Sequence, residues 1–314
     1  MHRPDFKAGE DEPRTSSNSA CRLCGTVTAL VQSHIVPAFV SRWLKDTSAT
    51  GFLRGFHVPN RRMQDFPTIE LLCRECEQRF SSAEKKFAEL VFVPFLNGRS
   101  RFTYDHWLLY FAVSMAWRCL ETSTGEGLKD HPQHVDPISR ARAAFASFLL
   151  GNRGEIRPYR FNLLFAPGGG SSEARLPEGL NWYLVRGADM TAVYSKSLAA
   201  AYVKLPGMLF WTSIVPPDPG GWKGTRIAKH GTIRSNKNQI VKDADVGTFL
   251  MGRADTIYKK ISDLSPEQKR RIEDTTSRDS RRAVESQSFE TFLQDERLRR
   301  DNRFKPRSDR TNNY

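Results

Sequence analysis

Two pairs of cysteines at C-x-x-C spacing constrain this chain more than any other feature of its sequence. Cys21 and Cys24 form the first pair, and Cys73 and Cys76 form the second. A tetrahedral zinc ion takes four ligands, and each C-x-x-C turn supplies two thiolates. We therefore expect one structural zinc site that joins the two pairs. Because 48 residues separate Cys24 from Cys73, more than a simple zinc ribbon holds, an insertion is expected between the pairs.

No secretory or membrane-spanning segment is predicted. Residues 1–19 are polar and charged, without the apolar core of a signal peptide. The most apolar stretch, 107–117, is shorter than the ~20 residues that cross a bilayer, so it is predicted to be a buried helix with Cys119 as a small core residue. We expect a cytoplasmic protein without a membrane partner. In such a reducing compartment, paired cysteines bind metal more often than they form disulfides.

The charge balance indicates the class of partner. A formal net charge of +13 favours a polyanion, most simply nucleic acid and DNA in particular. A solvated basic surface without a partner is the alternative. Arginines beside aromatic residues suit contact with a phosphate backbone combined with base stacking. The candidate contacts are Arg54, Arg61 and Arg62 near Phe52 and Phe56, Arg74 in the second cysteine pair, and the basic run with Lys223, Arg226 and Lys229.

Changes in composition along the 314 residues predict an α+β fold class with five segments. They are a disordered N-terminus (1–19), a zinc-bound module (20–98), a helical region that packs on it (99–151), an accessory or recognition domain of mixed antiparallel strands and helices (152–302), and a basic tail (303–314).

Hydrophobic periodicity and turn residues predict the individual elements. Strands are expected at 30–36, 157–166, 181–186, 191–195, 207–215 and 226–233, and residues 46–68 are expected to form a loop. Helices are expected at 38–45, 104–122, 137–150, 245–262, 265–275 and 281–302, and one more is expected after the second cysteine pair, where residues 81–84 have the spacing of a capping box.

Three short motifs follow one another in a fixed order within residues 20–95. They are CRLCG at 21–25, SHIVP at 33–37, and LLCREC at 71–76, which leads into a helix. This order resembles that of the HNH nucleases, the zinc-stapled branch of the ββα-metal fold. The resemblance covers under a third of the chain and implies an HNH-like module at 20–98.

The resemblance implies a metal-dependent endonuclease, a hydrolase that cuts DNA phosphodiester bonds. His34 stands at the position of the general base, which takes a proton from the attacking water. Ser33 and Glu77 stand at positions that bind a catalytic divalent cation, Mg²⁺ or Mn²⁺, which offsets the charge of the transition state. The resemblance further implies a setting in bacterial defence or in a mobile element.

The chain departs from the family pattern close to these positions. Ser33 replaces an acidic residue, Glu77 replaces a His or Asn, and the Asn usual a few residues before Cys73 is absent. Glu84 is a spare carboxylate on the same helix. The departures motivate an alternative: a catalytically degenerate zinc module that binds nucleic acid or a protein partner, with His34 structural. An RNA substrate stays open, as does a protein partner or self-association through the C-terminal region.

Overall fold

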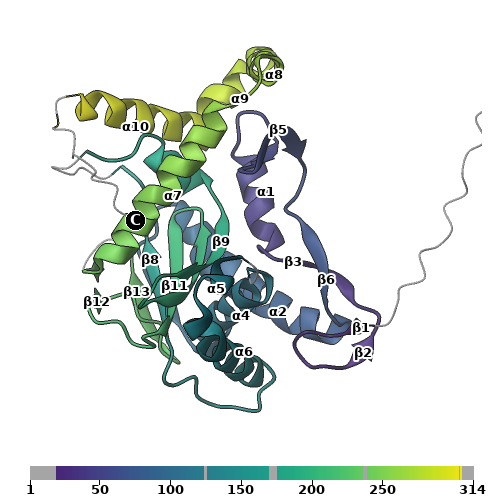
Figure 1. Ribbon diagram of the computed structural model, residues 1–314. Helices are drawn as coiled ribbons and strands as arrows, with labels where there is room; N and C mark the ends of the chain where they lie inside the picture. Colours follow the sequence, from purple (N-terminus) through teal and green to yellow (C-terminus); the bar gives the residue numbers. More distant parts are fainter. Residues whose placement is uncertain (1–18, 124–125, 170–174, 236–238, 304, 306–314) are drawn as a thin grey trace, which may run out of the picture.

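The computed structural model describes residues 19–123, 126–169, 175–235, 239–303 and 305 (Figure 1). The α+β class is confirmed, because helices alternate with small antiparallel sheets. The disorder predicted for residues 1–19 and the basic tail from 303 lie almost wholly outside the described residues. No helix in the described ranges is long and apolar enough to span a membrane.

The N-terminal elements build a β-β-α unit with an inserted hairpin. Strand β3 pairs antiparallel with β6, where Val31 lies opposite Leu72 and His34 opposite Thr68, and α2 follows β6 directly. The bounds are β1 Ser19–Ala20, β2 Val27–Thr28, β3 Val31–His34, α1 Ala38–Asp46, β4 Leu53–Gly55, β5 Val58–Met63, β6 Thr68–Leu72, α2 Arg74–Phe87, the π-helical turn η1 Ala88–Phe92 and α3 Val93–Leu96.

Two sequence predictions in this unit are wrong. Residues 46–68 contain the hairpin β4–β5 rather than loop alone, and Arg54 Nη1 donates to Pro59 O at 2.8 Å across it. The helix α2 does not begin at the predicted capping box, because Cys73 is its N-cap and places Ser81 in the helix interior. A cysteine N-cap gives no capping signal in the sequence, since it is not among the residues that usually fill that position.

The remaining elements form a four-stranded sheet and its helices. The antiparallel order is β8-β11-β10-β9, and β7 pairs separately with β13. The bounds are β7 Arg101–Tyr104, α4 His106–Thr122, α5 Glu126–Lys129, η2 Pro132–His134, α6 Val135–Leu149, β8 Arg160–Phe165, η3 Trp182–Arg186, β9 Asp189–Tyr194, β10 Ala199–Leu205, β11 Met208–Val215, β12 Trp222–Lys223, β13 Gly231–Arg234, β14 Ile240–Val241, α7 Ala244–Ser262, α8 Pro266–Arg278, α9 Ser280–Glu285 and α10 Gln287–Asn302.

Here too the structure corrects the sequence reading. The strand predicted at 181–186 is the π-helical turn η3, whose first N–H groups, those of Asn181 and Trp182, donate to the Asp295 carboxylate at 2.9 and 2.8 Å. The alanine-rich strand β10 was not predicted, although it is buried throughout. The helix predicted at 281–302 is divided at Ser286, whose hydroxyl accepts the Phe289 N–H and caps α10. Of the strand predicted at 226–233, only the end forms β13.

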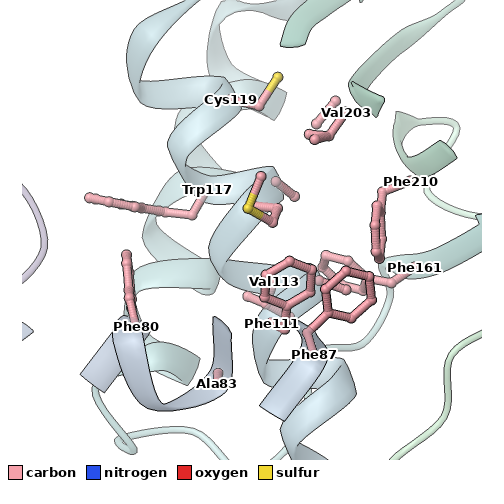
Figure 2. Packing of buried hydrophobic residues seen from close by; sticks show 14 of the residues in the cluster. Phe80, Ala83, Phe87, Phe111, Val113, Trp117, Cys119, Phe161, Val203 and Phe210 are labelled. Carbon is pink, nitrogen blue, oxygen red and sulfur yellow. The ribbon is translucent and has the colours of Figure 1, made fainter. Parts of the chain in front are cut away.

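The main core lies where α4 passes between α2 and the sheet (Figure 2). Phe87 of α2 stacks on Phe111 of α4 with ring centroids 4.1 Å apart, and both lie 5.6 Å from Phe210 of β11. The buried helix predicted around 107–117 is confirmed, and so is Cys119 as a core residue. Because burial of each large apolar side chain contributes about 1.5–3 kcal/mol, this contact fixes α2 firmly against the sheet.

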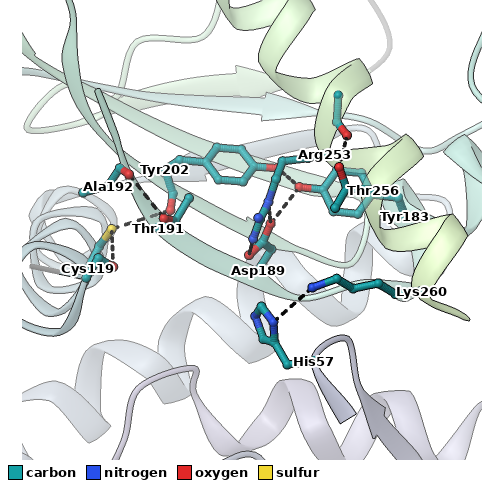
Figure 3. Close-up of polar contacts among 12 residues, drawn as sticks. His57, Cys119, Tyr183, Asp189, Thr191, Ala192, Tyr202, Arg253, Thr256 and Lys260 are labelled. Carbon is teal, nitrogen blue, oxygen red and sulfur yellow. Dashed lines mark hydrogen bonds and ion pairs between the residues drawn. The ribbon is translucent and has the colours of Figure 1, made fainter. Parts of the chain in front are cut away.

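A buried polar network fastens α7 to the other face of the sheet (Figure 3). Arg253 of α7 makes two hydrogen bonds to Asp189 of β9, at 2.7 and 2.8 Å. Tyr183 donates to Asp189 at 3.1 Å, and its hydroxyl lies 2.6 Å from that of Tyr202. Burial raises the pKa of Tyr202 well above its usual value, so this phenol stays neutral in the network. Every polar group that is named here has a partner, as buried polar groups require.

Candidate functional site

The four cysteines meet between the β1–β2 turn and the start of α2. Their Sγ atoms all lie within 4.8 Å of one another, and Cys24 Sγ is 3.8 Å from Cys73 Sγ. The Cys73 N–H donates to Cys21 Sγ at 3.3 Å, a contact that suits a sulfur carrying negative charge. The predicted cluster is therefore confirmed as a group that can hold a metal ion such as zinc. Its four sulfur donors match a structural zinc site in type and number.

The turn that presents the first cysteine pair depends on a glycine. Gly25 has a φ of 77°, and its N–H donates to Cys21 O at 2.8 Å to close the turn. A side chain would strain the backbone in this left-handed conformation. Hydrogen bonding at Thr26 lowers the pKa of the Cys24 thiol to about 6, against the opposing effect of burial. Burial raises the pKa of Cys76, which lies inside the first turn of α2.

Ser33 and Glu77, the two predicted cation ligands, are brought together. Ser33 Oγ donates to Glu77 Oε2 at 2.7 Å, from the buried side of β3 to the first turn of α2. The positive end of the helix dipole favours a carboxylate at this point. Within the described ranges, the four-cysteine cluster alone assembles three or more His, Cys, Asp or Glu side chains in metal-binding reach. Glu77 is thus a single carboxylate with a hydroxyl beside it.

His34 lies at the end of β3 and pairs with a residue that was not predicted. Its Nε2 is 3.1 Å from Asp65 Oδ2, while Asp65 Oδ1 accepts hydrogen bonds from Ser41 Oγ at 2.5 Å and from the Phe66 N–H at 2.8 Å. Burial acts to raise the pKa of Asp65, but the hydrogen bonds from Ser41, His34 and Phe66 outweigh it and lower the pKa. An ionised carboxylate only accepts hydrogen bonds, so Nε2 is the nitrogen that donates a proton to Asp65, and in the neutral form of an imidazole the other nitrogen, Nδ1, then carries the lone pair.

A buried arginine fixes the backbone of the same strand end. Arg118 of α4 is 2% exposed, and its Nη1 donates to His34 O at 3.0 Å. Its Nη2 forms an ion pair with Glu84, and the guanidinium lies 4.8 Å from the centre of the Phe80 ring. Glu84 is therefore not the spare carboxylate that the sequence suggested. Through these contacts Arg118 of α4 joins the end of β3 to α2 next to His34.

Asp65, Ser41 and Arg118 were missed by the sequence reading. Asp65 is one acidic residue in a loop, 31 positions after His34, and no spacing rule connects the two. The connection arises because β3 pairs with β6 and the loop before β6 returns past the end of β3. The available signal was only that an acidic residue stood among the basic and aromatic residues of the insertion.

The predicted nucleic-acid contacts are spread over several places. Arg54 is half-buried and bonds Gln268 Oε1 at 3.1 Å as well as Pro59, so it is engaged within the fold. Arg62 lies over the Phe52 ring at 4.7 Å. The other candidates, Arg61, Arg74, Lys223, Arg226 and Lys229, are exposed, and Arg226 and Lys229 line a cavity on another flank of α2.

Comparison of the chain with protein-family models, with curated proteins and with solved structures finds no match.

Proposed function

We propose that residues 20–95 form an HNH-type endonuclease module that hydrolyses DNA phosphodiester bonds in a metal-dependent reaction, with His34 as the general base. The observation that carries this proposal is the His34–Asp65 pair at the end of β3. It lies in a β-β-α unit beside the Ser33–Glu77 contact and the four-cysteine cluster. A net charge of +13 supports a polyanionic substrate.

The chemistry assigned to His34 follows from its partner. Asp65 holds the Nε2 proton, which leaves the Nδ1 lone pair to take a proton from water as the water oxygen attacks phosphorus. The side chain is 28% exposed, so a water molecule and a phosphate can reach it. Arg118 keeps the strand end in place through the His34 carbonyl, which reduces the reorganisation needed during the reaction.

Glu77 and Ser33 would hold the catalytic cation. Mg²⁺ in proteins is bound by one or two carboxylates, with waters and substrate phosphates completing its shell, and this pair meets that minimum. When bound, Mg²⁺ or Mn²⁺ would offset negative charge on the phosphate. Cys21, Cys24, Cys73 and Cys76 would hold a separate structural zinc ion that fixes the β1–β2 turn to α2.

The test compares His34→Ala with His230→Ala, a matched variant of an exposed histidine just before β13. Supercoiled plasmid is incubated with each protein in Mg²⁺, Mn²⁺ or EDTA, after equal zinc content is verified. We expect wild type and His230→Ala to nick the plasmid only with added metal. The nicking rate of His34→Ala should be lower by at least about 100-fold, because a positioned general base contributes an acceleration of at least that size. Cleavage by His34→Ala at the wild-type rate would remove the proposal.

A second candidate is a zinc module that binds nucleic acid or a protein partner without cleaving. The observation in its favour is that, among the described residues, the candidate cation site contains a single carboxylate, that of Glu77, beside Ser33. On this reading wild type and His34→Ala bind DNA equally and neither cuts it in any metal. Competition between RNA and duplex DNA for binding would identify the preferred nucleic acid in either case.

A further inference from the structure

A second site lies on the flank of α2 that faces away from Glu77. A cavity of about 670 Å³ is lined on this helix by Arg79, Ser82 and Lys86. With about 3.6 residues per turn, these positions project from the side opposite Glu77 and Glu84. None of the candidate catalytic residues lines the cavity. Its volume falls within the ~300–1,000 Å³ that small-molecule sites usually have.

The floor of this cavity is aromatic and apolar. Tyr110 of α4 lines it, held in place because its hydroxyl donates to Leu149 O at 3.2 Å and its ring centre lies 6.3 Å from that of Phe80. Burial raises the pKa of Tyr110 to about 12, against the influence of Arg79, so the phenol is uncharged. The other aromatic residues of the lining are Trp107, Phe148, Tyr159 and Phe161. Flat aromatic rings of this kind stack on nucleobases.

The rim of the cavity is cationic. Arg157 and Arg160 have carboxylate partners, Glu155 at 3.2 Å and Asp218 at 2.6 Å. Among the described residues, Arg79, Lys86, Arg226 and Lys229 form no ion pair with a carboxylate, and Glu155 is the one acidic side chain in the lining. Four uncompensated cations around an apolar floor attract an anion that also carries an apolar part.

The segment that carries Arg226 and Lys229 is held rigidly beside β8. The Ile227 N–H donates to Phe161 O at 2.8 Å, and the Leu163 N–H donates to Thr225 O at 2.8 Å. The Ala228 N–H donates to Tyr104 Oη at 3.2 Å. These bonds extend the edge of the sheet to the cavity mouth. A preformed wall of this kind reduces the ordering cost of binding a ligand.

We propose that this cavity binds a nucleoside phosphate, with the base on the aromatic floor and the phosphates on the cations of α2 and of segment 226–229. The ligand is either a free nucleotide or one nucleotide of a single strand, and the two share this chemistry. The site is separate from His34 and does not depend on cleavage there.

The test measures binding to the intact chain by calorimetry. The probes are ATP, AMP, adenosine, inorganic tripolyphosphate and a short single-stranded DNA. Arg226→Glu/Lys229→Glu is compared with Lys269→Glu/Arg270→Glu, an exposed matched pair on α8 with the same charge change that does not line the cavity. Arg79→Glu tests the opposite wall, and an unchanged melting temperature verifies folding of each variant.

We expect ATP to bind more tightly than either adenosine or tripolyphosphate, because adenosine lacks the phosphates for the rim and tripolyphosphate lacks the base for the floor. The cavity variants should weaken ATP binding by at least about tenfold, and the matched pair by less than about threefold. Tighter binding of the single strand than of ATP, lost in the same variants, would identify a strand as the source. Absence of saturable binding up to about 1 mM, equal loss in the matched pair, or equal binding of tripolyphosphate and ATP would overturn the proposal.

Discussion

Asp65 shows how one side chain in a loop can determine the chemistry of its neighbour. Replacing it by Asn keeps the shape but presents an NH₂ group that can donate to Nε2, which would move the ring proton to Nδ1 and block the base. We expect Asp65→Asn to lower kcat by at least about tenfold, part of the ~10²–10⁴-fold that a positioned base contributes, with KM and zinc content unchanged. Steady-state kinetics on a labelled oligonucleotide checks this. Asp46→Asn, an exposed carboxylate at the end of α1, is the control.

Cys119 differs chemically from the four clustered cysteines. Burial raises its pKa to about 12, and its Sγ lies 3.7 Å from Tyr202 O. The unfolded chain ionises this thiol near its ordinary value, so its contribution to stability is full below that value and is lost as pH rises toward about 12. We expect iodoacetamide at pH 8.5 to leave Cys119 unmodified in the folded chain and to label it in urea. Peptide mass spectrometry measures the labelling of Cys119 in both conditions. Rapid labelling without urea would contradict the burial of this thiol.

At the scale of elements, the cysteine cluster and the aromatic core stabilise different ends of α2. Cys73 and Cys76 fix its first turn to the β1–β2 turn, whereas Phe80 and Phe87 are buried in the core beneath. We expect metal removal by a chelator, or Cys73→Ser, to increase hydrogen exchange in residues 19–34 and at the start of α2. Exchange in the second half of α2 should stay slow. Cys119→Ser without chelator is the control. Unchanged hydrogen exchange in residues 19–34 after metal removal would show that a metal in the cluster does not stabilise this segment.

Which elements could be predicted depended on whether the pattern was local. The helix α4 and the cysteine cluster were predicted because an apolar run and two C-x-x-C turns are readable within a few residues. The turn η3 has an aromatic, branched sequence that is typical of a strand, and Asp295, more than a hundred residues later, captures its first N–H groups. The same holds for the site: His34 was identifiable from its motif, but its partner Asp65 was not, because the pairing of β3 with β6 brings them together.

At the scale of the whole molecule, the C-terminal helices rest on the inserted hairpin and α1. The Ala49 N–H donates to Ser288 Oγ at 2.9 Å, and the Ser265 N–H donates to Asn60 Oδ1 at 2.8 Å. In the hairpin turn, Nδ1 of His57 lies 3.4 Å from Nζ of Lys260 in α7 (Figure 3). Segments more than 200 residues apart therefore meet, and Figure 1 shows α8 and α9 directly above β5 and α1. Side chains from the C-terminal half complete the surroundings of the cysteine-containing module.

Arg186 makes a further buried connection, from η3 to α1 and its C-terminal end. It is 8% exposed, and it donates to Leu44 O and to Thr47 Oγ1, both at 2.6 Å, while its guanidinium lies 5.1 Å from the Trp43 ring centre. Burial lowers its pKa to about 10, so the side chain remains charged at neutral pH. Arg186→Met should lower the free energy of unfolding by about 2–3 kcal/mol, because a buried carbonyl loses a charged donor.

Which segments lose stability in Arg186→Met distinguishes a single cooperative unit from two domains that unfold independently. If segments 20–98 and 152–302 are coupled through Arg186, urea unfolding of Arg186→Met should remain a single transition at lower urea, with faster hydrogen exchange both in α1 and in β10. Arg281→Met, which removes an exposed ion pair with Glu285, should change the free energy of unfolding by less than about 1 kcal/mol. Two separate transitions, with only the sheet destabilised, would mean that the cysteine-containing module folds without support from the C-terminal half.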